Sequence, residues 1–167
     1  MFLTRRTIPR ACATAFLRSQ EPRFALRSTF WLMLSARQPI TIRFEDADPA
    51  GVVFYPRAIA LAHAAVEDLL RRSALGWDAW FASPHYAAPL RRAEADFFLP
   101  MKPGQSFEVC ASVEKTGTSS VTFLVEFLEA AGNTAARIRT VHVLIDKATG
   151  QPLPLTPEIR TALGTGA

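Results

Sequence analysis

A polar loop that precedes a predicted helix is the part of this sequence best suited to chemistry. The loop spans residues 45–51, contains Asp48 and ends in proline, alanine and glycine. A helix N-terminus offers unpaired backbone N–H groups and the positive end of the helix dipole, which can polarise a carbonyl and hold a developing oxyanion. A carboxylate beside those donors can attack the carbonyl or activate water. These groups together make a minimal acyl-transfer site without serine, cysteine or metal.

Two of the polar residues each have a second interpretation. Asp48 stands before a proline, and Asp-Pro is common in turns, so Asp48 also suits a turn or helix cap. His63 falls on the apolar face of the predicted helix, where it is either a core histidine or a polar group lining an acyl pocket. Glu45 and Asp46 are expected to be solvated loop acids. The residues alone leave these alternatives open.

The hydrophobic pattern around the loop predicts the elements that must position it. A helix is expected over residues 56–72 and a short second helix over 76–81, because apolar residues recur at three- and four-residue steps. Alternating patterns separated by glycine turns predict strands over residues 40–44, 89–98, 106–114, 120–127 and 134–146. The order predicts an α+β fold, in which a curved antiparallel β-sheet wraps around one long central helix.

The charge and the hydrophobic pattern of the chain together divide it into three parts. Residues 1–37 hold seven arginines and one acid, whereas the remaining 130 residues carry a net charge of −2. The 1–37 segment is predicted to be a disordered leader, a targeting segment, or an extension upstream of a true start at Met33. Residues 38–150 are predicted to form the folded domain, and 151–167 a C-terminal tail. The folded part lacks the positive field that nucleic-acid binding requires.

The composition disfavours several other classes of protein. Cys12 and Cys110 are too few for a disulfide framework and lack metal-ligand spacing, so we expect a cytoplasmic protein with no metal and no cofactor. No apolar run approaches the roughly 18 residues that a membrane-spanning helix needs. The sequence therefore predicts a globular domain with a substantial core.

The loop also resembles a family signature. The segment Asp46-Ala47-Asp48-Pro49-Ala50-Gly51-Val52-Val53-Phe54-Tyr55-Pro56 resembles the signature of the 4-hydroxybenzoyl-CoA thioesterase family of hotdog proteins. Residues 117–123 are similar to the Gly-x-Ser-Ser strand entry of that family, which is a weaker motif. The resemblance extends from about residue 39 to residue 146, roughly two thirds of the chain.

The resemblance implies a hotdog fold, hydrolysis of an acyl-CoA substrate, and a homodimer or homotetramer with active sites at the protomer interface. It places the catalytic carboxylate at Asp48 and the carbonyl-polarising backbone N–H at Tyr55. Four further positions are expected to bind substrate, Gly51, Val52, Lys115 and Ser120, and His63 joins them from its place on the predicted helix. One departure is that relatives acting on aryl-CoA carry a basic cluster for the CoA phosphates where this chain has only Lys115.

Two other functions compete with thioester hydrolysis. A hotdog hydratase or dehydratase would act on acyl thioesters with a histidine base, whereas this loop offers Asp48. A non-catalytic hotdog protein would bind acyl-CoA or a protein partner without needing that carboxylate. We therefore predict a thioester hydrolase that converts an acyl- or aryl-CoA into the free acid and CoA, with the acyl group left open.

Overall fold

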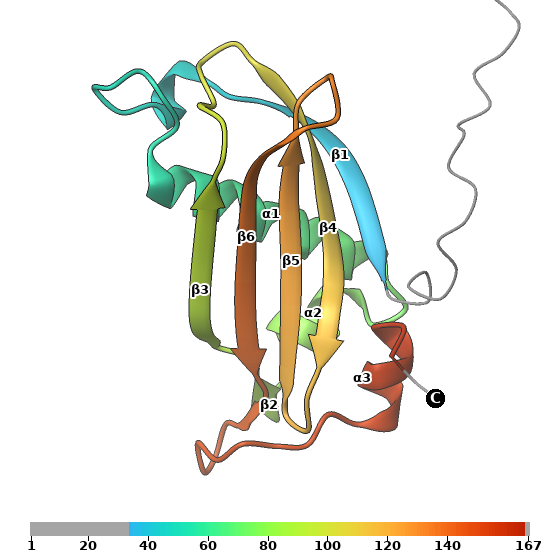
Figure 1. Ribbon diagram of the computed structural model, residues 1–167. Helices are drawn as coiled ribbons and strands as arrows, with labels where there is room; N and C mark the ends of the chain where they lie inside the picture. Colours follow the sequence, from blue (N-terminus) through green and yellow to red (C-terminus); the bar gives the residue numbers. More distant parts are fainter. Residues whose placement is uncertain (1–33, 166–167) are drawn as a thin grey trace, which may run out of the picture.

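One long helix, α1 (Tyr55–Arg72), lies across the concave face of a five-stranded antiparallel sheet in the computed structural model, which describes residues 34–165 (Figure 1). The strands follow the spatial order β1-β4-β5-β6-β3. Their bounds are β1 Ser35–Thr41, β3 Leu90–Phe97, β4 Ser106–Thr116, β5 Ser120–Leu128 and β6 Thr134–Val143. The predicted sheet wrapped around a central helix is confirmed.

Smaller helices and strands complete the fold around the sheet and α1. Helix α2 (Gly76–Phe81) follows α1, and strands β2 (Tyr86–Ala87) and β7 (Ile145–Asp146) pair in a second, two-stranded sheet. A short helix, α3 (Pro157–Ala162), ends the described chain. No helix within residues 34–165 is long and apolar enough to cross a membrane.

Helix α1 packs through a face of small and branched side chains. Its buried residues are Ala58, Ala62, Ala65, Val66, Leu69 and Leu70. The helix packs mainly on β4, β1 and β5, where alternate residues such as Val109, Phe123 and Val125 are fully buried. The three alanines allow the helix backbone to approach the sheet closely, so the burial of apolar surface fixes the helix on the sheet.

The first strand ends earlier than the sequence pattern predicted. Strand β1 stops at Thr41, and Phe44–Asp46 forms a 3-10 turn in place of the predicted strand over residues 40–44. The cause is local, because the Asp46 carboxylate accepts a hydrogen bond of 2.8 Å from the Arg43 N–H. Asp46 is only 2% exposed, so the prediction that it is a solvated acid is wrong, whereas Glu45 is exposed.

Strand β3 forms one edge of the sheet and is exposed on both faces. Its sequence alternates as predicted, yet only Ala95 among its eight residues is even half-buried. Large apolar side chains are exposed along this strand and just beyond it: Leu90, Phe97, Phe98 and Leu99. An unpaired edge flanked by exposed apolar groups is a surface on which another strand can pair.

The C-terminal segment belongs to the same core as the sheet. Leu155, Ile159 and Leu163 are buried, and Arg160 of α3 donates hydrogen bonds to the carbonyls of the β4–β5 turn, at 2.8 Å for Gly117. The predicted tail over residues 151–167 is therefore packed up to residue 163. Strand β1 begins inside the predicted leader, and the three interpretations of that leader concern residues 1–33, which lie outside the described part of the chain.

His142 is a buried polar residue of the core whose protonation should affect stability. Its ring lies against Trp80 and Phe123, and its Nδ1 is 2.9 Å from the Ala88 carbonyl oxygen. Burial lowers the pKa of His142 below its ordinary value of 6.5, although the hydrogen bond to Ala88 opposes this shift. The unfolded chain therefore binds this proton more readily than the folded protein does.

We expect the free energy of unfolding to fall as the pH drops below 6.5, because protonation of His142 favours the unfolded chain. A His142→Phe variant should show a flatter dependence over the same range, since phenylalanine does not titrate. Urea denaturation at pH 7.5, 6.5 and 5.5 measures both slopes. Equal slopes for the wild type and the variant would contradict this role of His142.

Candidate active site

The Asp48 loop is a small hairpin held by its own backbone. An antiparallel bridge joins Ala47 to Val53, and the Asp48 N–H donates to the Val52 carbonyl at 2.9 Å. Gly51 has φ of +74°, and its N–H donates to the Asp48 carbonyl at 2.9 Å. That φ is costly for residues with a Cβ, so glycine at position 51 allows the hairpin to close.

The carboxylate of Asp48 is hydrogen-bonded through only one of its two oxygens. One oxygen, Oδ1, accepts a hydrogen bond of 2.8 Å from the Ala50 N–H, as in a turn. The other oxygen, Oδ2, has no hydrogen-bond partner among residues 34–165, and the side chain is half-buried. The turn bond orients the carboxylate and leaves one oxygen available for chemistry.

The start of α1 provides a free backbone donor beside this carboxylate. The N–H groups of Arg57 and Ala58 both donate to the Phe54 carbonyl, at 2.8 and 3.2 Å, and Pro56 has no N–H. The Tyr55 N–H makes no hydrogen bond within the described chain. No side chain caps the helix, so the Tyr55 amide remains available to an incoming oxygen.

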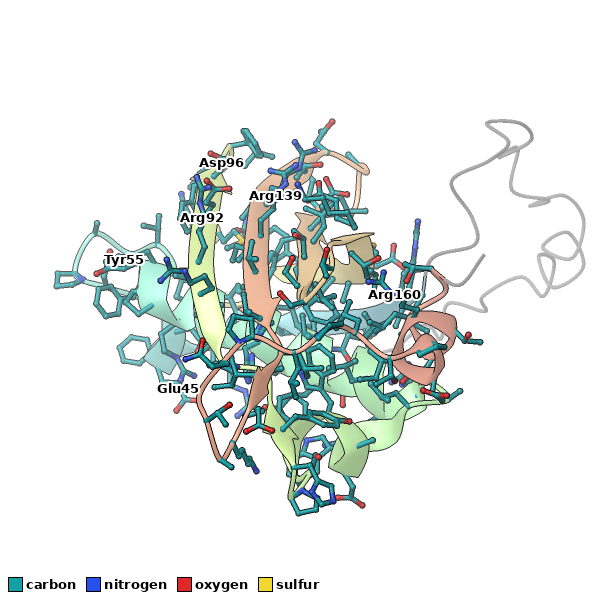
Figure 2. The ribbon with its side chains drawn as sticks, turned by 90° about the horizontal axis from the view of Figure 1, so that it is seen from below. Glu45, Tyr55, Arg92, Asp96, Arg139 and Arg160 are labelled. Atoms are coloured by element: carbon teal, nitrogen blue, oxygen red, sulfur yellow. The ribbon has the colours of Figure 1, made fainter. Side chains whose placement is uncertain are left out.

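Asp48 and Tyr55 line one pocket of about 180 Å³. Its lining comes from the loop, the helix start, the last residue of β3 and the residues that follow β3. The remaining lining residues are all apolar: Val52, Val53, Phe97, Leu99, Pro100 and Met101. The Tyr55 side chain is 62% exposed and projects from the same end of the molecule as Glu45 (Figure 2). The arrangement can hold an apolar acyl group with its carbonyl near both a carboxylate and an amide.

The contribution of the β3 end to this pocket was missed in the sequence. Phe97 was assigned only to a strand, Met101 only to a turn, and Leu99 to no element. Phe97, Phe98 and Leu99 form an apolar run that crosses the end of the strand, which breaks the alternating pattern. That run was the available signal, because a large apolar group in a turn usually has a packing partner or a ligand.

His63 lies on α1 but outside this pocket. It is eight residues beyond Tyr55, or about 12 Å along the helix axis. Its side chain is 45% exposed, with Nε2 3.2 Å from a Glu67 carboxylate oxygen, and its ring meets Phe81 edge-on. Its predicted place on the buried face is wrong, because the buried face is centred on Ala62, Ala65 and Val66, and position 63 falls at its margin.

Lys115 and Ser120 lie far from Asp48 within one protomer. They flank the β4–β5 turn, whereas the Asp48 loop follows the end of β1 that pairs with the start of β4 (Figure 1). Strand β4 has 11 residues, so these two ends of the sheet are separated by roughly 35 Å. The structure therefore brings together Asp48, Val52 and Tyr55, with Gly51 beside them, and leaves Lys115, Ser120 and His63 apart.

Comparisons with known proteins agree on one family. Residues 42–163 match the model of a family described as the thioesterase-like superfamily. A 1,4-dihydroxy-2-naphthoyl-CoA hydrolase from Nostoc punctiforme is 31% identical over 121 residues, covering 71% of this chain and 80% of that protein. One of the same name from Rippkaea orientalis is 29% identical and covers 71% and 88%.

A solved structure shows the same arrangement of elements. The crystal structure of a 1,4-dihydroxy-2-naphthoyl-CoA thioesterase from Synechocystis superposes with a TM-score of 0.70 at 25% sequence identity. The superposition covers 77% of this chain and 95% of the other. Since almost all of the other chain is included, its fold corresponds to the part of this chain described above.

Proposed function

The chain belongs to the thioesterase-like superfamily, and from this membership we propose that it hydrolyses aromatic acyl-CoA thioesters at the pocket formed by Asp48 and Tyr55. Its fold is the hotdog fold, and its enzyme class is thioester hydrolase. One observation carries the assignment of the site: Asp48, whose carboxylate keeps a free oxygen, and Tyr55, whose backbone N–H is unpaired, line the same largely apolar pocket.

In the proposed reaction, the thioester carbonyl oxygen accepts a hydrogen bond from the Tyr55 N–H. Attack on the carbonyl carbon then forms a tetrahedral oxyanion that this N–H stabilises. Asp48 acts either as the nucleophile, forming an acyl–carboxylate anhydride that water hydrolyses, or as the base that removes a proton from the attacking water. In both cases the C–S bond breaks and the products are the free acid and the CoA thiol.

We propose an aromatic acyl group as the preferred substrate. The pocket walls contributed by Phe97, Leu99 and Met101 are apolar and suit a flat ring system. The relatives named above are hydrolases of 1,4-dihydroxy-2-naphthoyl-CoA, a two-ring substrate, so this thioester is our first candidate. The narrower resemblance to 4-hydroxybenzoyl-CoA thioesterases makes 4-hydroxybenzoyl-CoA the second.

A substrate panel tests this proposal. Release of free thiol from 1,4-dihydroxy-2-naphthoyl-, 4-hydroxybenzoyl-, butyryl- and palmitoyl-CoA should give a kcat/KM at least about tenfold higher for the aromatic thioesters, because the mostly apolar lining favours burial of a ring. A preference for an aliphatic chain would overturn the aromatic assignment. Hydration of an added enoyl-CoA without thiol release would instead indicate a hydratase.

We further propose that two copies pair through the edge of β3. A two-fold axis across this edge makes the two β3 strands antiparallel. The β4–β5 turn of the second copy then lies beside the C-terminal end of β3 in the first copy, which is the end that holds the pocket. In that continuous sheet, β5 of the second copy lies about 14 Å from β3 of the first. An extended CoA molecule can cover this distance, which gives Lys115 and Ser120 a binding role from the opposite protomer.

His63 is proposed to affect binding and not the chemical step. It lies on the exposed side of α1 with Ala60 and Ala64, about two turns from Tyr55. A His63→Ala variant should raise KM by a few fold or change the order of the substrate panel, and its kcat should stay within about twofold of the wild type, because the ring does not reach the carbonyl. A large fall in kcat alone would place His63 in the chemical step.

A further inference from the structure

We infer that the ion pair between Asp46 and Arg57 positions the catalytic loop against the start of α1. This inference rests on the proposed role of Asp48. Asp46 is the residue that opens the hairpin, and Arg57 is the third residue of the helix. The pair therefore joins the part of the site that supplies the carboxylate to the part that supplies the Tyr55 N–H.

The carboxylate of the pair is buried, and both of its oxygens are hydrogen-bonded. The Arg57 guanidinium donates two hydrogen bonds to Asp46 Oδ1, from Nε at 2.9 Å and from Nη2 at 2.6 Å. The other oxygen, Oδ2, accepts from the Arg43 N–H at 2.8 Å. The Asp46 side chain is 2% exposed, whereas Arg57 is 44% exposed. Both carboxylate oxygens are thus satisfied, and the orientation of Asp46 is fixed.

The backbone of Asp46 holds the other end of the same hairpin. Its carbonyl accepts a hydrogen bond of 2.8 Å from the Phe54 N–H, immediately before the first helical residue. This bond closes the hairpin, and the Val53 N–H anchors the returning side of the hairpin to the Met101 carbonyl at 2.8 Å. The Arg57 guanidinium adds a side-chain tie between the hairpin and the first turn of the helix, because its two donors converge on Asp46 Oδ1 while the Arg43 N–H holds Oδ2. Loss of the pair should let the Asp48 carboxylate move relative to the Tyr55 N–H.

Asp46 and Arg57 do not touch the proposed substrate pocket. They line a separate hollow of about 440 Å³, together with Leu61 and the end of β1. None of its lining residues lines the pocket that contains Asp48. The pair therefore does not contact the substrate in the proposed pocket, and we assign Asp46 and Arg57 as positioning residues.

Charge complementarity supports the same assignment. Burial raises the pKa of Asp46, but the Arg43 N–H and the Arg57 guanidinium outweigh it and hold this pKa below its ordinary value. Asp46 is thus ionised at neutral pH.

The test is a cycle of substitutions with the aromatic thioesters named above. Asp46→Asn keeps the shape of the side chain and removes its charge, and we expect kcat to fall about tenfold or more with KM little changed, because small displacements of catalytic groups are costly. In an Asp48→Asn background, the same Asp46→Asn change should lower the remaining kcat by less than about twofold, because the group that Asp46 positions is already absent.

An equal fold-change of kcat in the wild-type and Asp48→Asn backgrounds would show that Asp46 acts on general structure. An unchanged kcat in the wild-type background would show that Asp46 positions no catalytic group. Either result overturns the inference. If Asp48→Asn itself retained full activity, the proposed function of the site would fail instead, so the two failures are distinguishable. Should Asp46→Asn not fold, Arg57→Gln in both backgrounds applies the same criterion. Arg57→Lys, which can form one hydrogen bond of the pair, should recover part of the loss.

A matched control lies on the same helix. Arg71 and Asp68 form an exposed pair with a 2.8 Å contact that touches neither the hairpin nor the pocket. Arg71→Gln should leave kcat within about twofold of the wild type, since exposed ion pairs contribute little. A loss of kcat in this variant equal to that of Arg57→Gln would attribute both effects to the helix as a whole and contradict the assigned role of Asp46.

Discussion

An Asp48→Asn variant is expected to lose at least about 10²-fold in kcat while KM changes little. The amide keeps the size of the side chain and can still accept the 2.8 Å hydrogen bond from the Ala50 N–H, so the turn should survive. What disappears is the anionic oxygen that attacks the carbonyl or activates water, and general-base contributions are typically 10²–10⁴-fold. Because the carboxylate acts in the transition state, the loss should appear in kcat.

The control is the same substitution at Asp78, an exposed residue of α2 outside the pocket. Asp78→Asn should match the wild type in both kinetic constants. Initial rates of thiol release over a range of substrate concentrations measure all three proteins. If Asp48→Asn retained more than about a third of the wild-type kcat, Asp48 would be a turn residue and the catalytic assignment would be wrong.

An Ala93→Glu variant is expected to be monomeric and to lose roughly 10²-fold in kcat/KM. Ala93 is exposed and lies near the middle of β3, next to Glu94 on the unpaired edge strand. In a two-fold antiparallel pair, residues near the middle of the strand lie opposite their own copies, so two added carboxylates would repel each other. Activity should fall with the dimer because the proposed site requires elements of both copies.

Ala130→Glu is the matched control, because Ala130 is exposed in the β5–β6 turn, away from the β3 edge. Size-exclusion chromatography with light scattering gives the mass of each variant beside its rate. The wild type and Ala130→Glu should have at least twice the 18.4 kDa of one chain. A monomeric Ala93→Glu protein with full activity would refute the interface site.

Local patterns predicted most of the fold. The short helix over residues 76–81 was predicted with its observed bounds, and α1 begins one residue before the prediction. These elements follow from hydrophobic periodicity and from turn residues that are close in sequence. The end of β1 was mispredicted because a side chain of the turn, Asp46, bonds the backbone three residues earlier, and alternation does not report such bonds.

From the sequence, the candidate site was predictable only for those residues that belong to one segment of the chain. Asp48, Val52 and Tyr55 come from a single hairpin and helix start, so their proximity follows from spacing along the chain. Phe97 and Leu99 reach the same pocket across the fold, and the partner of Asp46 is 11 residues away on a helix. Contacts of this kind depend on tertiary packing, which short-range periodicity does not encode.

A single-turnover measurement tests the central claim most directly. Enzyme in excess over 1,4-dihydroxy-2-naphthoyl-CoA, quenched at successive times, separates the chemical step from binding and product release. We predict that the wild type converts the bound thioester completely to free acid and CoA. We predict also that Asp48→Asn binds a similar amount of substrate and converts it at least about 10²-fold more slowly. Equal conversion rates for the two proteins, or no thiol release by the wild type from this or any other thioester of the panel, would contradict the account.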